Sequence, residues 1–83
     1  MLFRSGAVKN GMTKDAALKV AAQAVLGSAK MILESNEHPW KLVDAVCSPG
    51  GTTIEGVASL QEDGFESSVI KAVEASFNKD KSL

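Results

Sequence analysis

The sequence predicts an all-α protein, a small bundle of four main helices. Three observations favour this class. Apolar residues recur at helical spacing in the long middle segment and again near the C-terminus, no segment shows the strict alternation of a half-buried strand, and proline, glycine and threonine separate the segments. With 83 residues, the chain forms at most one small domain.

A domain of this size has difficulty in stabilising itself alone. A lone hydrophobic core in such a chain contributes only about 3–5 kcal/mol of net stability. Cys47 is the single cysteine, which excludes an internal disulfide, and His38 is the single histidine, which excludes a Cys/His zinc site. Oligomerisation is therefore the expected source of additional buried area.

Composition excludes several classes of function. The net charge is −1 and no run of Lys and Arg is long enough to follow a phosphate backbone, so we expect no nucleic-acid partner. The most apolar stretch covers residues 16–33, and the polar residues that interrupt it are Lys19, Gln23, Ser28 and Lys30. Because of these interruptions, we expect no membrane span. A single unpaired cysteine fits a reducing compartment, and the expected location is cytoplasmic.

The N-terminal end precedes the domain proper in our interpretation. Residues 1–5 have no apolar run of signal-peptide length, and we interpret them as a cloning or assembly remnant, which leaves residues 6–83 as the domain. Residues 6–11 have the pattern of the end of an earlier helix that an Asn-Gly pair stops. Thr13 then caps the next helix, with Asp15 in its first turn on the favourable side of the helix dipole.

The next helix covers residues 14–35, a length of roughly 33 Å. Its apolar surface is wide. One narrow apolar stripe is interrupted by the polar residue Ser28; it consists of Ala17, Val20, Ala21 and Ala24. A second, broader apolar face consists of Leu18, Ala22, Val25, Leu26, Ala29, Ile32 and Leu33. A helix that is apolar on most sides must be covered on most sides. Two interpretations remain open, a central core helix of a monomer and a helix partly covered by a second subunit.

Two short helices follow. The first covers residues 39–46, and Pro39 suits its first position because the missing N–H is not needed there. The second covers residues 54–62, with Thr52 or Thr53 as its N-cap.

The last helix covers residues 65–78, and residues 79–83 have the composition of a frayed polar tail. Its apolar residues follow an amphipathic helical pattern. They are Phe65, Val69, Ile70, Val73 and Phe77.

One motif carries chemistry, the segment Ser48-Pro49-Gly50-Gly51-Thr52-Thr53 between the short helices. Two glycines free the backbone, and N–H groups at the start of a helix form an anion site that the helix dipole reinforces. A carboxylate or phosphate can bind there, with a threonine hydroxyl as a further partner. The same residue types make an ordinary helix–helix turn, and spacing alone leaves both interpretations open. The segment is not a nucleotide P-loop, since no lysine follows the glycines and no strand precedes them.

Other single residues give weaker signals. Cys47 has no neighbouring base and is interpreted as a small buried thiol rather than a nucleophile. His38 is interpreted as a helix cap or surface residue, and Trp40 as either a core residue or an interface anchor. The carboxylates of the same region lie on solvated faces in our interpretation, and we expect no metal site; they are Glu34, Glu37 and Asp44.

Many further residues around the loop, and some upstream of it, match the sequence pattern of one known protein family. They are His38-Pro39, Leu42, Asp44, Val46, Ser48 through Ile54, Gly56, Leu60, Gly64-Phe65, Val73-Glu74-Ala75-Ser76 and, upstream, Ala21-Ala22-Gln23 and Leu26 through Met31. Over residues 6–81 this pattern resembles the C-terminal dimerisation domain of the pyrroline-5-carboxylate reductase family.

The resemblance implies a fold, an activity and a site. Enzymes of this family reduce 1-pyrroline-5-carboxylate to L-proline with NADPH or NADH, in proline biosynthesis. Their C-terminal domains interlock into a homodimer, in some members within a larger ring, and the active site includes helical elements of the partner. The resemblance further implies that Thr53 is the catalytic residue and lies near the ring nitrogen of the substrate. It also implies that the loop binds the substrate carboxylate; the loop residues are Ser48, Pro49, Gly50, Gly51, Thr52 and Thr53.

Two parts of the family pattern are absent from the chain. One is the glycine-rich strand–turn–helix of a dinucleotide site, and the other is the Gly-Ser-Gly-Pro-Ala-Tyr-like start of the helical domain. We therefore expect a deliberate fragment, an incomplete gene model or a redesigned domain, which by itself binds no NADP or NAD and transfers no hydride. The alternative functions are a purely structural dimerisation module and an unrelated four-helix adaptor; the density of matching positions disfavours the adaptor.

Overall fold

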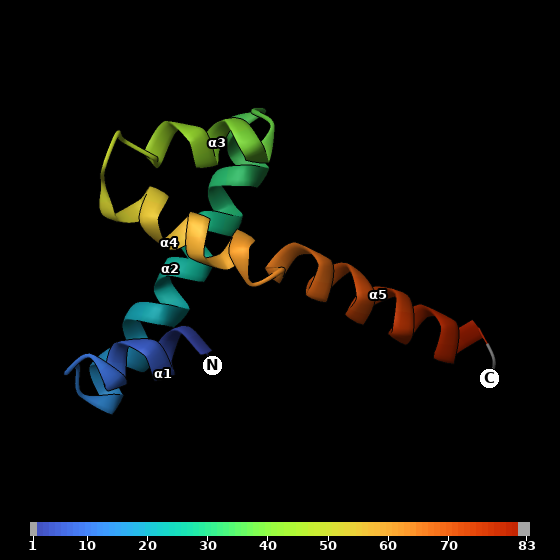
Figure 1. Cartoon of the computed structure of the whole chain (residues 1–83), viewed down its shortest axis with the longest axis horizontal. Coiled ribbons are helices and arrows are strands. Elements are labelled where there is room, and N and C mark those ends of the chain that lie inside the picture. Colours follow the sequence, from blue (N-terminus) through green and yellow to red (C-terminus); the bar gives the residue numbers. More distant parts are fainter. Residues whose placement is uncertain (1, 82–83) are drawn as a thin grey trace. The chain divides into compact units, whose positions relative to one another are not determined.

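The computed structural model describes residues 2–81, in which it contains five α-helices and no strand. They are α1 (Leu2–Lys9), α2 (Lys14–Ser35), α3 (Pro39–Val46), α4 (Thr52–Glu62) and α5 (Phe65–Lys81), shown in Figure 1. The predicted all-α class is confirmed, with a short first helix before the four main ones. The chain divides into a first unit, Met1–Leu42, and a second unit, Val43–Leu83, so that the division falls inside α3.

Helix α1 begins earlier than the sequence pattern indicates. It starts at Leu2 and thus includes four residues that the pattern places outside the domain. None of these four residues is a glycine or proline, and leucine and arginine are good helix formers. The expected stop is present: the Asn10 side chain donates a hydrogen bond of 2.9 Å to the carbonyl of Gly6, and Gly11 has φ +106°.

Helix α2 has the predicted bounds, and both of its ends are set by local hydrogen bonds or backbone angles. The hydroxyl of Thr13, the predicted N-cap, accepts a hydrogen bond from the Ala16 N–H at 3.3 Å. At the other end, Asn36 is the C-cap in the left-handed region with φ 58°, a conformation that asparagine tolerates better than most residues. The polar turn that follows separates α2 from α3.

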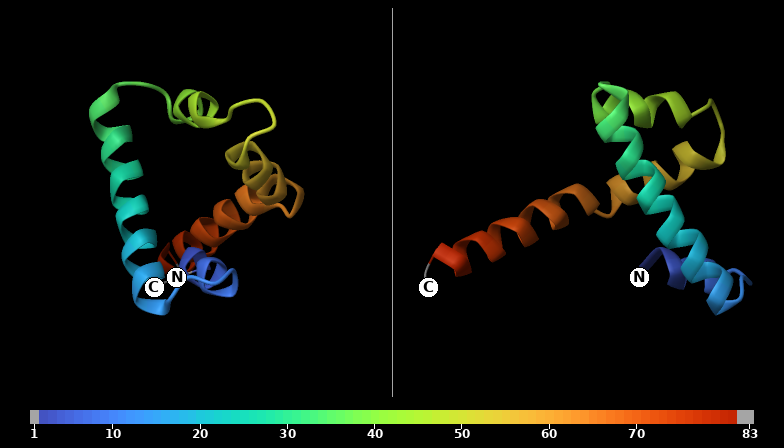
Figure 2. Two further views of the ribbon diagram at one scale, coloured as in Figure 1. Left: turned by 90° about the vertical axis from the view of Figure 1, so that its left-hand side faces the viewer. Right: turned by 180° about the vertical axis from the view of Figure 1, so that it is seen from behind.

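In the first unit, α1 packs against the N-terminal half of α2, and the two helices lie side by side in Figures 1 and 2. Ala17 of α2 is the single buried residue in the part of the chain that the structure describes. Beside this contact runs an apolar hollow of about 560 Å³, here called the α1–α2 groove. Its lining residues are Phe3, Ala7, Ala17, Val20, Ala21, Ala24, Val25, Ser28, Ala29 and Ile32.

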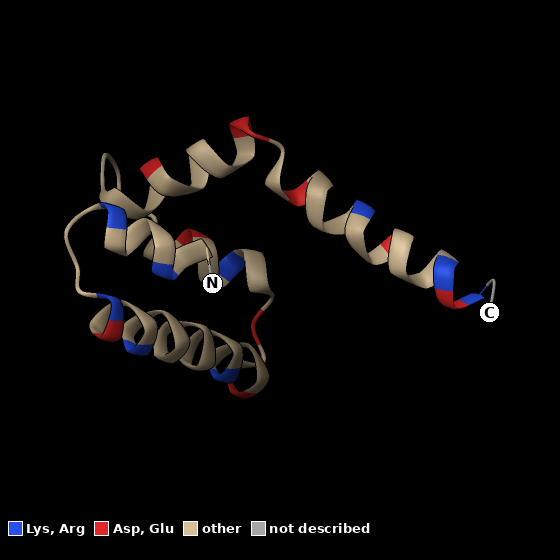
Figure 3. Ribbon diagram, turned by 90° about the horizontal axis from the view of Figure 1, so that it is seen from below, with Lys and Arg blue, Asp and Glu red and all other residues tan. Residues whose placement is uncertain are grey.

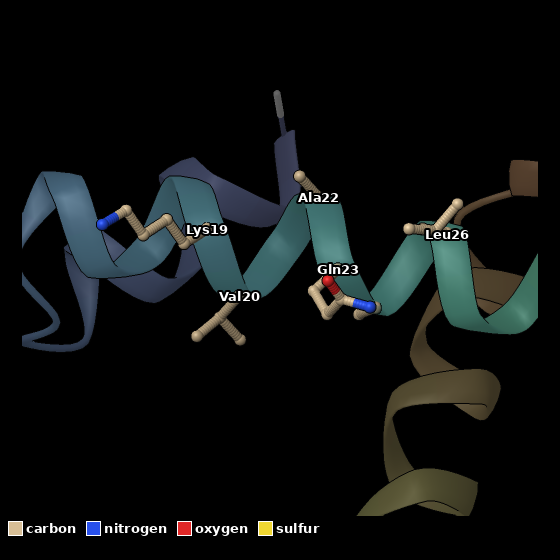
Figure 4. Close-up of a pocket in the computed structure, with 6 residues that line it drawn as sticks. Lys19, Val20, Ala22, Gln23 and Leu26 are labelled. Carbon is tan, nitrogen blue, oxygen red and sulfur yellow. The ribbon is translucent and has the colours of Figure 1, made fainter.

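Most of the apolar surface of α2 is exposed. Large side chains such as Leu26 and Leu33 expose 61% and 82% of their area. A second hollow along α2, of about 750 Å³, mixes polar and apolar side chains, and Figure 4 shows Val20 and Ala22 extending from opposite sides of the helix. The first unit by itself therefore does not provide a core that covers α2.

Helix α2 is also the one described helix that is long and apolar enough to cross a membrane by length and composition. Its mean hydropathy over an 18-residue window is 1.4. The polar residues that interrupt its apolar run therefore do not exclude a span by themselves. The core helix of a soluble protein meets the same criterion, so the criterion does not decide between the two roles.

In the second unit, α4 and α5 contact each other at a turn in which Gly64 has φ +73°. Helix α4 starts at Thr52, two residues earlier than expected, and α5 continues to Lys81, three residues beyond its expected end at 78. Lysine in the last turn favours this extension because a cation stabilises the negative end of the helix dipole. Figure 3 shows charged residues of both signs along α5. Residues 82–83 of the expected polar tail lie outside the described residues.

Replacing the α2 cap tests this account of local structure. We expect Thr13→Ala to lower the free energy of unfolding by about 1 kcal/mol, because the N–H of Ala16 loses its acceptor. Thr13→Ser keeps a hydroxyl at the same position and should stay within a few tenths of a kcal/mol. The measurement is urea unfolding followed by circular dichroism at one fixed chain concentration. Equal losses in the two variants would contradict the capping role.

Candidate functional site

The predicted loop forms a tight turn inside the second unit. The N–H of Gly51 donates a hydrogen bond of 3.0 Å to the carbonyl of Ser48, which closes a four-residue turn. Pro49 occupies the second position of the turn, and Gly50 the third with φ +69°. This is the arrangement of a type II turn, in which proline pre-sets one angle and glycine supplies the positive φ of the next.

The turn delivers the chain into the start of α4 without a side-chain cap. Gly51 is the N-cap residue, in extended conformation with φ −80° and ψ 174°. The prediction that Thr52 or Thr53 caps this helix is wrong, because both residues already lie inside it. Gly51 takes the cap position since its N–H is held by the Ser48 carbonyl, which fixes where the turn ends and the helix begins.

The first turn of α4 therefore presents unpaired polar groups. The first N–H groups of a helix have no partner within the helix, and here no side chain of the N-cap replaces one. Thr52 and Thr53 are exposed, as are three of the four turn residues, and Gly51 is half-buried. The first turn of α4 thus combines N–H groups that have no partner within the helix, two exposed threonines and the positive end of the helix dipole, which are the groups that an anion site requires.

Close packing inside the turn restricts Gly51 specifically. A Cβ atom added at Gly51 would lie 2.5 Å from the hydroxyl oxygen of Ser48 and 3.3 Å from its carbonyl oxygen. At Gly50 the space is open, and the positive φ alone disfavours a side chain there. Gly50 is therefore needed for its backbone angle, and Gly51 for its lack of a side chain.

The described hollows do not enclose the loop. All three lie on residues of the first unit, and none includes a residue from 48 to 53. Among residues 2–81, no group of three or more His, Cys, Asp or Glu side chains could hold a metal ion. Cys47, directly before the loop, is half-buried rather than fully buried. Ser48, Pro49 and Gly50 of the loop are exposed.

The other single residues lie at the end of the first unit. The ring Nδ1 of His38 accepts a hydrogen bond of 3.2 Å from the Trp40 N–H, which fits the interpretation of His38 as a helix cap. Lys41 forms a 3.1 Å ion pair with Glu37 on the same exposed surface. Trp40 is 52% exposed, so within the first unit it is not a core residue.

Comparison with known proteins assigns the chain. The profile described as "Pyrroline-5-carboxylate reductase dimerisation" matches residues 2–83. The chain belongs to the pyrroline-5-carboxylate reductase dimerisation family. It is 56% identical over 77 residues to pyrroline-5-carboxylate reductase of Escherichia coli strain K12, which covers 93% of this chain and 29% of that protein. It is 49% identical over 78 residues to human pyrroline-5-carboxylate reductase 2, covering 94% of this chain and 24% of that protein.

Solved structures of reductases share the same fold. The 1-pyrroline-5-carboxylate reductase of Streptococcus pyogenes is similar with a TM-score of 0.94 and 40% identity, over 99% of this chain and 32% of that one. The pyrroline carboxylate reductase of Plasmodium falciparum, solved with NADP bound, is similar with a TM-score of 0.92 and 34% identity, over 96% of this chain and 30% of that one. The chain spans less than a third of the length of these relatives.

Family membership and loop geometry leave the individual roles of the loop residues as predictions. Sequence reasoning also missed two features. Gly51 as the cap of α4 was not foreseen, although a glycine directly after a Pro-Gly pair is a signal for a turn that ends in a cap. The contribution of Phe3 to the α1–α2 groove was missed because residues 1–5 were excluded from the domain, although its spacing of four residues from Ala7 indicates one helix face.

A glycine comparison tests the geometry of the turn. We expect Gly51→Ala to lower the free energy of unfolding by about 1 kcal/mol, because the new Cβ meets the Ser48 hydroxyl. Adding Ser48→Ala should recover part of this loss. Gly56→Ala, inside α4 with nothing within 4 Å of the added Cβ, is the matched control and should stabilise by about 0.5–1 kcal/mol. Denaturant unfolding of these variants and of the parent chain measures the free energies of unfolding. If Gly51→Ala lowers the free energy of unfolding equally with and without Ser48→Ala, contact with the Ser48 hydroxyl is not the cause.

Proposed function

We propose that the chain is the dimerisation and substrate-loop domain of a pyrroline-5-carboxylate reductase, which reduces 1-pyrroline-5-carboxylate to L-proline. The observation that carries the proposal is the exposed Ser48–Thr53 turn that ends at the uncapped start of α4, in a chain of this family.

The substrate has a carboxylate that suits this surface. In the proposal, the carboxylate accepts hydrogen bonds from the N–H groups at the start of α4, and the helix dipole stabilises its negative charge. The Ser48 and Thr52 hydroxyls are further donors at the edge of the same turn. This contact holds the ring in one orientation, which is the part of catalysis that a positioning loop contributes.

Thr53 has a separate role in the proposal. Its hydroxyl lies on the first turn of α4, exposed beside the carboxylate-binding N–H groups. A hydroxyl both accepts and donates hydrogen bonds, so it can contact the ring nitrogen before and after the nitrogen gains a proton. Thr53 is therefore the candidate catalytic residue of this chain.

The nicotinamide cofactor requires other residues. A Rossmann-type dinucleotide site needs a strand followed by a glycine-rich turn and a helix, and residues 2–81 contain helices without a strand. The described residues do not fit NADP or NAD, and in the proposal a separate domain holds the cofactor that supplies the hydride. The relative from Plasmodium falciparum was solved with NADP bound.

The partner in the proposal is a second copy of the chain. Large apolar side chains along α2 and α5 are exposed, and the matching family is described by dimerisation. Apolar area of this extent on a protein that dimerises marks the interface. A cytoplasmic location is part of the proposal, in keeping with one unpaired, half-buried cysteine.

A purely structural dimerisation module is the second candidate. The observation in its favour is that the three described hollows lie on the first unit and include no loop residue. In this case the turn connects α3 and α4 and binds nothing specific.

A ligand titration separates the two candidates. We expect L-proline to shift amide NMR signals of residues 48–56, because its carboxylate occupies the start of α4, whereas acetate at the same concentration gives smaller shifts there. Shifts spread over the whole chain, or equal shifts with acetate, would contradict a specific site. A well-dispersed spectrum without shifts would favour the structural module.

A hydroxyl series tests Thr53 in the chain joined to a family cofactor domain. We expect Thr53→Ala to lower kcat at least about tenfold, as the loss of one hydrogen bond in the transition state commonly does. The free energy of unfolding should change by less than about 0.5 kcal/mol, since alanine is a good helix former. Thr53→Ser should retain most activity, and Ser59→Ala, another exposed hydroxyl on α4, is the control. Full activity of Thr53→Ala would refute its assignment.

A further inference from the structure

The start of α3 depends on a single residue, His38. Pro39 occupies the first helical position and has no N–H, so Trp40 supplies the first N–H of the helix. That N–H donates a hydrogen bond of 3.2 Å to the ring Nδ1 of His38, and the Lys41 N–H donates one of 2.9 Å to the His38 carbonyl. His38 therefore accepts from the first two N–H groups of the helix, as an N-cap residue does.

The imidazole serves as a cap in one protonation state only. Nδ1 accepts a hydrogen bond when the ring is neutral and carries its proton on Nε2, whereas both nitrogens of the imidazolium ion are donors. Protonation therefore replaces an acceptor with a donor that faces the Trp40 N–H, and it places a positive charge at the positive end of the helix dipole. Both changes destabilise the start of α3. Histidine is the side chain whose ordinary charge change falls between about pH 5 and 8, so this change is accessible near neutral pH.

The charged groups around His38 leave this effect in place. His38 is exposed, so protons reach its ring from solvent. Glu37, directly before it, forms a 3.1 Å ion pair with Lys41, and a carboxylate that is already paired compensates a second positive charge only in part. Glu34 in the last turn of α2 and Asp44 in α3 are the other charged groups of this region. The extensive helix packing among residues 2–81 joins α1 with α2 and α4 with α5, and α3 is not part of it.

Helix α3 is short enough for its cap to matter. It has eight residues, and isolated helices of fewer than about 12 residues are marginal in water. Leu42 and Val43 are half-buried, and the other residues of α3 are exposed. At the far end the Cys47 N–H donates a hydrogen bond of 3.1 Å to the Asp44 carbonyl, and the Ser48–Gly51 turn begins with the next residue. A looser α3 therefore leaves the loop without a fixed segment before it.

We infer that His38 is a pH-sensitive cap of α3: the neutral imidazole holds the start of the helix, and protonation releases it and loosens the Ser48–Thr53 loop that follows. The hydrogen bond fixes the direction of the effect, because the stability that the cap contributes to α3 is present while the ring is neutral and is lost as pH falls through the titration of the ring. His38 is thus a positioning residue for the loop. The consequence for ligand binding rests on the proposed function, in which the loop binds a carboxylate.

An NMR titration of the chain between about pH 8 and about pH 5 tests the cap. The expected result is that the α-carbon shifts of residues 40–43 move toward non-helical values, together with the Trp40 amide signal and with the same midpoint as the ring protons of His38. In His38→Asn the side-chain oxygen can accept the same hydrogen bond and does not titrate, so these shifts should stay helical throughout. The Ala16 amide, which the Thr13 hydroxyl caps, is the internal control and should not change.

Three outcomes of this titration would overturn the inference. The first is a set of α3 shifts that stays helical at the acid end in the parent chain. The second is an equal loss of helical shifts in His38→Asn, which would assign the effect to another titrating group. The third is a change of the same extent at Ala16, which would show general unfolding rather than release of one cap.

Binding of L-proline at both ends of this range separates the inference from the proposed function. The apparent dissociation constant should be at least about twofold higher at the acid end, because fewer molecules hold the loop in its binding conformation. The carboxylate of L-proline stays ionised over the range, and His38→Asn should remove most of the difference. Equal affinities in the parent chain at both ends would overturn the link from α3 to the loop. Absence of binding at both ends would contradict the proposed function, while the α3 shifts still decide whether His38 is a pH-sensitive cap.

Discussion

The structure depends on one constraint, a shortage of buried apolar area. Ala17, where α1 meets α2, is the single fully buried side chain among the described residues, while large apolar residues along α2 and α5 are exposed. Hydrophobic burial is the main favourable term in folding, and two units of about half the chain each cannot supply it. The helices are therefore locally well defined, but neither unit by itself buries enough apolar area to stabilise them.

The loop is independent of this shortage because its geometry is local. The Ser48 carbonyl, the fixed angle of Pro49 and the positive φ of Gly50 define the turn without help from a core. Gly51 then starts α4 with its first N–H groups free. The site of the proposed function would therefore keep its donors in place by local geometry alone.

The sequence predicted the features that local interactions determine. The bounds of α2 and α3 followed from Thr13, from the polar turn after Ser35 and from Pro39, since caps and breakers act within a few residues. The start of α4 was predicted wrongly because two threonines were stronger cap signals than a glycine, and the deciding hydrogen bond from Gly51 to Ser48 belongs to the preceding turn. The anion site stays a prediction: spacing alone left it open beside an ordinary turn, and its ligand came from family resemblance. The α1–α2 groove could not be predicted, because it requires two helices to be placed side by side.

The exposed apolar surface of α2 has a genetic consequence in a protein of a dimerisation family. In a two-fold assembly a substitution on this surface occurs twice in each dimer of altered chains. An altered chain that no longer pairs stays out of the dimers of its unaltered counterpart. Substitutions that abolish pairing are therefore expected to act recessively in a cell that makes both versions, whereas an altered chain that still pairs enters mixed dimers.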